Sequence, residues 1–478
     1  MKHDNTINHH TLSIASRDNH RALCAKASKN CQLSIILVFT LLLSGCSLYR
    51  PYGETQTVPD GIMGEGVCQA GDTTSLGAIG WRQLFTDPLL QELIERALAN
   101  NTNVQQAQLT IEQAQNDLAT ARLGNLPTLS FEPSGTLTRF NGLTTRSYVV
   151  PLAASWQMNI FGQVTSRKRQ ARARKQMEED YKQAVRTNLA ANVAATYYNL
   201  IMYDRELKIL QETQVVWEES LEAMRVLFEA GLYMSPAVYQ MEASLASVQS
   251  GIVEVQENIR ITEAALCLLL SEPPHPIERA QFGKFVMPEQ LHVGLPIRLL
   301  EARPDVRQAA RNIEVAYYDV QQARQSFYPD ITINATLGWS NGEGAINPAQ
   351  FLAQAIGSLA QPIFSQGRLK TRYKNAKIDQ EKARLQFTQI LLTAGNEVYR
   401  HLRICHKTEQ KAAYLASIVQ SLNEAYVGTR ELMNNGTNTY VEVLKSQEDL
   451  LTAQITEVQN HFEGIQAFIN LYTALGGF

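Results

Sequence analysis

The sequence contains little cysteine and no long hydrophobic run. Six of its 478 residues are cysteines, and Cys68, Cys267 and Cys405 are widely separated. Neither a disulfide framework nor a zinc-ligand spacing can be drawn from them. The most apolar segment, residues 33–43 (LSIILVFTLLL), is too short for a membrane helix, which needs roughly 20 residues. If the chain crosses a membrane, we therefore expect it to do so as β-structure.

A strong charge bias and the common catalytic motifs are missing as well. The net charge is −3, which gives no reason to expect a nucleic-acid partner. There is no phosphate-binding glycine-rich loop, no G-x-S-x-G motif and no paired metal motif. His401 and Cys405 are spaced like zinc ligands on a helix, but the sequence offers no matching second pair. We therefore expect no enzyme activity, no cofactor and no metal.

The apolar segment has the length of a signal-peptide core and ends in a cysteine. Leu43-Ser44-Gly45-Cys46 resembles the lipobox of bacterial lipoproteins, in which the cysteine carries a diacylglycerol and becomes the mature N-terminus. The resemblance implies a signal peptide over 1–45 and a lipidated, extended segment over 46–80. Several acyl chains on one residue would hold the protein firmly on a membrane. The alternative is an ordinary signal peptide with an incidental cysteine.

The rest of the chain contains an internal duplication. Residues 104–127 align without gaps on residues 306–329, with ten of the 24 positions identical. Further matches follow at similar offsets, such as Gly231 with Gly436. Because self-similarity over so long a period indicates two copies of one structural module, we assign residues 81–295 to a first repeat and residues 296–478 to a second.

Each copy opens with a helix whose small and large apolar residues alternate at spacings of three and four. This period of 3.5 predicts a coiled-coil seam. The seam residues are Val104, Ala107, Ile111, Ala114, Leu118 and Ala121 in the first copy, and Val306, Ala309, Ile313, Ala316, Val320 and Ala323 in the second.

After each of these helices the apolar period changes to two. The alternation predicts β-hairpins over residues 128–159 and 330–361, with one apolar and one polar face. Segments of about ten residues with this pattern fit the strands of a membrane β-barrel. A pair of hairpins in a soluble sheet is the alternative.

Each hairpin is followed by an unusually long helical stretch. Residues 164–230 contain neither proline nor glycine, so a continuous helix there would be about 100 Å long. Gly231 ends this stretch, and Asn435-Gly436 ends its counterpart in the second copy. A glycine between two helices suits the left-handed residue of a tight turn. Each half therefore reads as helix, hairpin, long helix, turn and helix.

Four strands per chain are too few to close a barrel, since about eight is the practical minimum. Open sheet edges in lipid would leave backbone groups without hydrogen bonds. We therefore expect other copies of the chain to supply the missing strands. Two copies would give a filled eight-stranded barrel, whereas three would give a twelve-stranded barrel with a lumen. The predicted fold is mainly α, with this β-barrel and a helical barrel built from the long helices.

Four segments carry a family resemblance: residues 81–90 (WRQLFTDPLL), 228–232 (FEAGL), 299–306 (LLEARPDV) and 471–477 (LYTALGG). They resemble the TolC-like outer-membrane efflux factors and, together with Cys46, the lipoprotein branch that serves resistance–nodulation–division pumps. The resemblance implies a homotrimer in the outer membrane, with a periplasmic helical tunnel and a mixed equatorial domain. It also implies a passive duct that exports drugs or other small molecules. The implied partners are a periplasmic adaptor (membrane fusion) protein and an inner-membrane transporter. A type I protein-secretion duct and a periplasmic coiled-coil scaffold are the alternatives.

In that family the periplasmic tip of the duct is closed by coiled coils, so the resemblance also indicates candidate sites. The gate candidates are Asn438, Tyr440, Glu442 and Lys445. Three copies of Glu442 would form an acidic ring that favours cations; a Glu442–Lys445 pair on a solvated helix face is the alternative. The residues at the two turns are the candidates for adaptor docking: Gly231, Leu232, Gly436 and Thr437.

Overall fold

The computed structural model describes residues 51–53, 80–282, 299–341, 350–435 and 440–477. These residues form two compact units. The sheet unit contains residues 125–166 and 324–363, and the helical unit contains most of the remainder. The predicted signal peptide and Cys46 lie outside the described residues.

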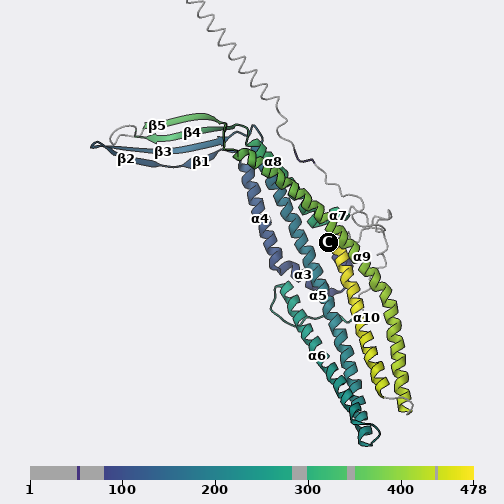
Figure 1. Ribbon diagram of the computed structural model, residues 1–478. Helices are drawn as coiled ribbons and strands as arrows, with labels where there is room; N and C mark the ends of the chain where they lie inside the picture. Colours follow the sequence, from purple (N-terminus) through teal and green to yellow (C-terminus); the bar gives the residue numbers. More distant parts are fainter. Residues whose placement is uncertain (1–50, 54–79, 283–298, 342–349, 436–439, 478) are drawn as a thin grey trace, which may run out of the picture. The chain divides into compact units, whose positions relative to one another are not determined.

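The sheet unit is a single antiparallel sheet in the order β1/β2–β3–β4–β5 (Figure 1). Its strands are β1 (Thr128–Phe131), β2 (Ser134–Phe140), β3 (Leu143–Gln157), β4 (Asp330–Ser340) and β5 (Gln350–Ala360). Both β1 and β2 pair with β3 in one continuous register. They are therefore one interrupted strand, and the break falls at Pro133, which has no N–H to donate. The β3–β4 pairing joins the two copies of the duplication.

The register sorts the side chains of this sheet onto one apolar and one polar face. Phe131, Leu152, Leu337 and Ala353 lie opposite one another across successive strands. On the other face polar side chains pair, as in the 2.7 Å bond from Ser155 Oγ to Asn334 Oδ1. The apolar face remains exposed in the single chain, with Phe131, Phe351 and Leu359 each more than 60% accessible.

The helices of the two copies match closely in length. The first copy contains α2 (Trp81–Leu84), α3 (Pro88–Asn100), α4 (Thr102–Leu123), α5 (Gln163–Glu229) and α6 (Ser235–Leu270). The second contains α7 (Leu299–Ala302), α8 (Pro304–Gln325), α9 (Arg368–Asn434) and α10 (Tyr440–Ala474). Helices α4 and α8 both have 22 residues, and α5 and α9 both have 67. This correspondence agrees with the duplication in the sequence.

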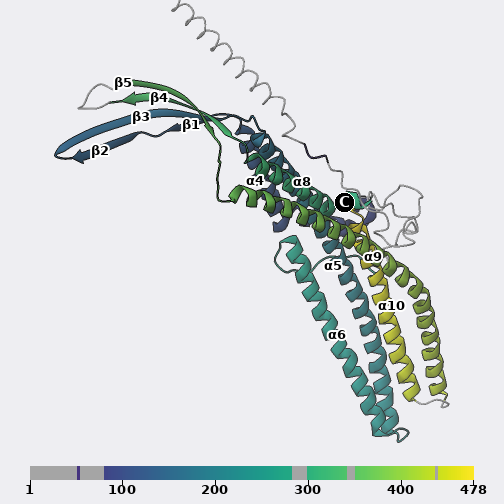
Figure 2. The same cartoon turned by 45° about the horizontal axis from the view of Figure 1, so that its top comes forward.

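Within the helical unit, α5 with α6 and α9 with α10 form two antiparallel hairpins (Figures 1 and 2). Among the helices of the described ranges, none combines the length and the apolar character needed to cross a bilayer. Large aromatic side chains are fully buried between the helices, just before α3, in the middle of α5 and in the last turns of α10. The largest of these are Phe85, Tyr197, Phe468 and Tyr472.

A polar network fixes the chain that leaves α6. Tyr197 Oη donates to Asp87 at 2.5 Å and accepts from the Ala280 N–H at 3.0 Å. Arg279 binds both Asp204 oxygens, at 2.5 and 2.8 Å, and Glu263 at 2.6 Å. Because the polar groups of this network have partners, the network holds the start of α3, the middle of α5 and the end of α6 together.

Candidate functional site at the ends of the helical hairpins

The turn between α5 and α6 is closed by a glycine in the left-handed conformation. Gly231 has φ +74°, and the N–H of Leu232 donates to the Leu227 carbonyl at 2.9 Å. This is the hydrogen bond of a Schellman motif, which favours glycine at this position. Leu232 and Met234 are 70% and 80% exposed. The turn therefore presents apolar side chains to the solvent.

The second turn is described only up to Asn435 and from Tyr440 onward. Asn435 caps α9, and its N–H donates to the Glu431 carbonyl at 3.1 Å. Gly436, Thr437 and Asn438, which the sequence suggested as docking and gate residues, lie outside the described residues. The candidate site that the structure describes therefore consists of the Gly231 turn and the first three turns of α10.

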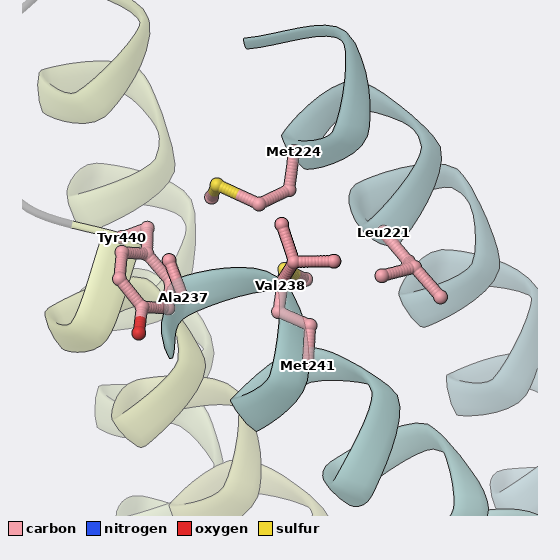
Figure 3. Close-up of a cluster of buried hydrophobic side chains, with 6 residues drawn as sticks. All are labelled: Leu221, Met224, Ala237, Val238, Met241 and Tyr440. Atoms are coloured by element: carbon pink, nitrogen blue, oxygen red, sulfur yellow. The ribbon is translucent and has the colours of Figure 1, made fainter. Parts of the chain in front are cut away.

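Tyr440 is buried, with 9% of its surface accessible. It projects from α10 toward the α5–α6 hairpin of the same chain, into a cluster with Met224, Ala237 and Val238 (Figure 3). Its hydroxyl donates to the Gln240 side chain on α6, and its ring meets the Tyr233 ring edge-on at 5.8 Å. Tyr440 thus connects the two hairpins through both apolar packing and a hydrogen bond.

A second polar contact joins the same two helices one turn further along. Ser244 Oγ on α6 donates to Glu448 on α10 at 3.2 Å. Each hairpin also has a polar link of its own, Arg225 to Glu242 at 2.8 Å and Thr429 to Ser446 at 3.0 Å. A cavity of about 180 Å³ remains between the hairpins, lined by Met241, Tyr440 and their neighbours. Near their ends the two hairpins are therefore joined, among the described residues, by one apolar cluster and two side-chain hydrogen bonds.

Glu442 and Lys445 are both exposed, but they do not form the pair considered above. Lys445 Nζ binds Asp449 at 2.7 Å instead, which raises the pKa of Lys445 through the hydrogen bond and the nearby negative charge. Among the ion pairs of the described residues none involves Glu442. Its side chain lies on the exposed face of the first turn of α10.

The sequence indicated Tyr440 but gave no signal for Gln240, Ser244 or Glu448. These three polar residues lie on long helices with many similar residues. Only the packing of α6 against α10 distinguishes them. Elsewhere, His401 and Cys405 are buried with 8% and 2% exposure, and burial raises the pKa of the Cys405 thiol to about 11. No group of three metal-ligating side chains occurs in the part of the chain that the structure describes.

Comparison with known proteins gives relatives along almost the whole chain. The sequence is 27% identical over 450 residues to the cation efflux system protein CusC of Escherichia coli strain K12, covering 91% of this chain and 97% of CusC. It is also 27% identical over 457 residues to the probable outer membrane lipoprotein SilC of Salmonella typhimurium, covering 93% and 98%. A crystal structure of CusC, described in connection with transmembrane channel formation, superposes with a TM-score of 0.81 at 25% identity, covering 91% of this chain and all of that one.

The profile of the family described as "Outer membrane efflux protein" matches the chain twice, at residues 93–272 and at residues 295–477. The two matches coincide with the two copies of the duplication, and together they cover well over half of the chain. The chain therefore belongs to the outer membrane efflux protein family, and it acts in efflux at the outer membrane.

Proposed function

We propose that three copies of this chain form a passive duct in a tripartite efflux system. A periplasmic adaptor protein and an inner-membrane resistance–nodulation–division transporter would be its partners, and drugs, cations or other small molecules its cargo. Cys46 would carry lipid and assist attachment to the outer membrane. The names of the relatives support this class of cargo, since CusC is a cation efflux protein.

The open sheet is the observation that carries the proposal. Among the described strands, β1/β2 pairs with β3 alone and β5 pairs with β4 alone, so each outer strand has one edge without a described partner strand. A free edge next to an exposed apolar face is unstable in lipid, because backbone groups would lack partners. Neighbouring copies would pair with both edges, and cyclic symmetry is the usual way to satisfy every copy.

An exposed apolar stripe on α9 supports the same assembly. Ile378, Leu385, Leu392 and Tyr399 recur every seven residues and are between 42% and 63% exposed. A heptad repeat of apolar residues normally faces another helix. In the proposed trimer a helix of the neighbouring copy would cover this stripe.

The contacts of Tyr440 support a gate at the hairpin ends. One hydrogen bond to Gln240 and a small apolar cluster connect the two hairpins there. A hydrogen bond of this kind contributes about 1 kcal/mol, so a partner that binds the exposed Leu232 turn could separate the hairpins. Glu442 would then face the passage and favour cations.

Single-channel recording in planar bilayers tests this function. We expect Tyr440→Phe to raise the conductance of the closed state and Glu442→Gln to lower the cation selectivity. Tyr414→Phe and Glu409→Gln are matched controls, because both residues are exposed on α9 and neither belongs to the cluster or the cavity around Tyr440. No channel activity by the wild type would contradict the duct. Unchanged closed-state conductance and selectivity in both variants would contradict the gate alone.

A further inference from the structure

Each long helix begins with a strongly basic segment directly after the sheet. Residues 167–175 contain six Lys and Arg residues, and residues 368–377 contain five. Between residues 158 and 177, and again between 361 and 378, there is no acidic residue. The two segments occupy equivalent places in the two copies, although the whole chain is slightly acidic.

This placement is unfavourable for the helices themselves. The first turn of a helix carries partial positive charge, so acidic residues stabilise it and basic residues destabilise it. Neither α5 nor α9 has an acidic residue in its first turn. Since both copies have this arrangement, the basic residues serve a purpose other than helix stability.

Most of these side chains are solvent-exposed and have no acidic partner within the described chain. They are Arg167, Lys168, Arg172 and Arg174 on α5, and Arg368, Lys370, Arg372 and Lys374 on α9. Two further lysines differ: Lys175 pairs with Glu179 at 2.6 Å, and the exposed Lys377 lies over the Tyr373 ring, 4.8 Å from its centroid. The buried residues Ser166, Gln170 and Ala173 form the packed face of α5, so Lys168 and Arg172 lie on the opposite side of the helix.

Chain continuity places these residues next to the sheet. Strand β3 ends at Gln157 and α5 begins at Gln163, while β5 ends at Ala360 and α9 begins at Arg368. Exposed apolar side chains fill both connections: Ile160 is 51% exposed, Ile363 96% and Phe364 84%. Apolar side chains followed by a cluster of basic ones are typical of a chain that leaves a membrane through its polar surface.

We propose that the eight exposed basic residues named above, Arg167 to Arg174 on α5 and Arg368 to Lys374 on α9, bind the phosphate groups of anionic phospholipids at the membrane surface beside the sheet. This inference rests on the location of the sheet in the outer membrane. One Lys or Arg near an anionic surface strengthens binding about fivefold. The two segments would thus hold the helical unit at a fixed height relative to the membrane, independently of the lipid on Cys46.

Electron paramagnetic resonance of spin-labelled lipids tests the proposal on the full-length protein in phosphatidylcholine vesicles. The quantity measured is the association of spin-labelled phosphatidylglycerol relative to spin-labelled phosphatidylcholine. We expect a several-fold preference for phosphatidylglycerol in the wild type, which the triple variant R167Q/K168Q/R172Q reduces by at least half. The control R403Q/K411Q/R430Q removes one Lys and two Arg residues from exposed sites in the middle and lower part of α9, and it should keep the preference.

The preference should also fall as salt is raised, because charged contacts at a surface are screened. The salt dependence is measured on the wild type alone, so it tests phospholipid binding even if a variant does not assemble. A wild type without preference, a preference that survives high salt, or an equal loss in the control would overturn the proposal. A change in single-channel ion selectivity with an unchanged lipid preference would place the basic residues along the duct and overturn it too. None of these results would contradict the duct, which the recordings of Tyr440 and Glu442 variants test separately.

Discussion

Helices α4 and α8 have the same length and the same seam pattern, yet their surroundings differ. Ile313 in α8 is completely buried, whereas the equivalent Ile111 in α4 is only half-buried. On one side α8 contacts α5, through Gln170 to the Val315 carbonyl. On its other side it shares a polar groove with α9. The seam of α8 is therefore covered within one chain.

Helix α4 has a described neighbour on one side, α5, through the 2.6 Å bond from Lys182 to Gln108. Leu109 on α4 remains 58% exposed. Leu109 is not a seam residue; of the seam of α4, Val104, Ala107 and Leu118 are buried, whereas Ile111, Ala114 and Ala121 are only half-buried within the described part of the chain. The duplicated sequence thus encodes one kind of helix, and the position of that helix in the fold decides how completely its seam is buried.

In both repeats, a side chain just before α4 or α8 donates a hydrogen bond to a carbonyl near the end of the last helix, but the donor residue differs. Asn101, just before α4, donates to the Leu269 carbonyl near the end of α6 at 2.9 Å. Arg303, just before α8, donates to the Ala474 carbonyl at the end of α10 at 3.0 Å. The second copy adds charge, because Arg303 also binds Asp305 at 2.8 Å and Glu397 at 2.9 Å.

The largest expected effect comes from shortening the seam residues. We expect Ile313→Ala to lower the free energy of unfolding by about 3 kcal/mol, because the substitution leaves a cavity in a fully buried part of the seam. In the assembled trimer Ile111→Ala should cost about the same, since a neighbouring copy would cover α4. Denaturant unfolding of the detergent-solubilised trimer measures both. A cost below about 1 kcal/mol at Ile111 would mean that α4 keeps a solvated face in the assembly.

Removing the side-chain bonds of Arg303 and Asn101 to the helix ends should lower the free energy of unfolding by a smaller amount. Arg303→Ala should cost about 2 kcal/mol, because a buried guanidinium and its bond to the Ala474 carbonyl are lost. Asp305 and Glu397 stay partly exposed, so water can solvate them. Asn101→Ala should cost about 1 kcal/mol, measured in the same unfolding experiment. Equal costs would show that the charges around Arg303 contribute nothing beyond the shared bond.

The smallest effect concerns pH and His401, whose counterpart in α5 is the non-titrating Thr196. Burial and the neighbouring Arg400 lower the pKa of His401 below its usual value of 6.5. The folded state therefore favours the neutral ring, and this contribution to stability is present above about pH 6.5 and is lost as the pH falls through the lowered value. Between about pH 7 and pH 5 we expect the His401→Thr variant to lose less free energy of unfolding than the wild type, the difference being under about 1 kcal/mol.

Unfolding measured at several pH values checks this expectation. His406→Gln, a half-buried position on the same helix, is the matched control. His461 is subject to the same effect, because burial lowers its pKa as well. The His401 variant should therefore remove only part of the acid sensitivity. A pH profile identical to that of the wild type would show that His401 is not buried as a neutral ring.

Much of this architecture could be predicted from the sequence because periodicity and length are local properties. A period of two in residues 330–340 and a run of 67 residues without proline or glycine are enough to predict the strand β4 and the helix α5. The break at Pro133 could not be separated from the alternation around it, since proline is tolerated at the edge of a sheet. The charge balance similarly concealed the basic segments, because acidic residues elsewhere on the helices offset them.

The sequence by itself determined the duplicated order of helices and strands, the amphipathic sheet and the turn at Gly231. Each of these depends on neighbouring residues or on one backbone angle. Only the tertiary structure decided that Tyr440 donates to Gln240, that Lys445 pairs with Asp449 and that Ile313 is buried while Ile111 is not. Those contacts join or separate residues on long, compositionally similar helices. Their choice depends on how the helices pack against one another, which no local pattern encodes.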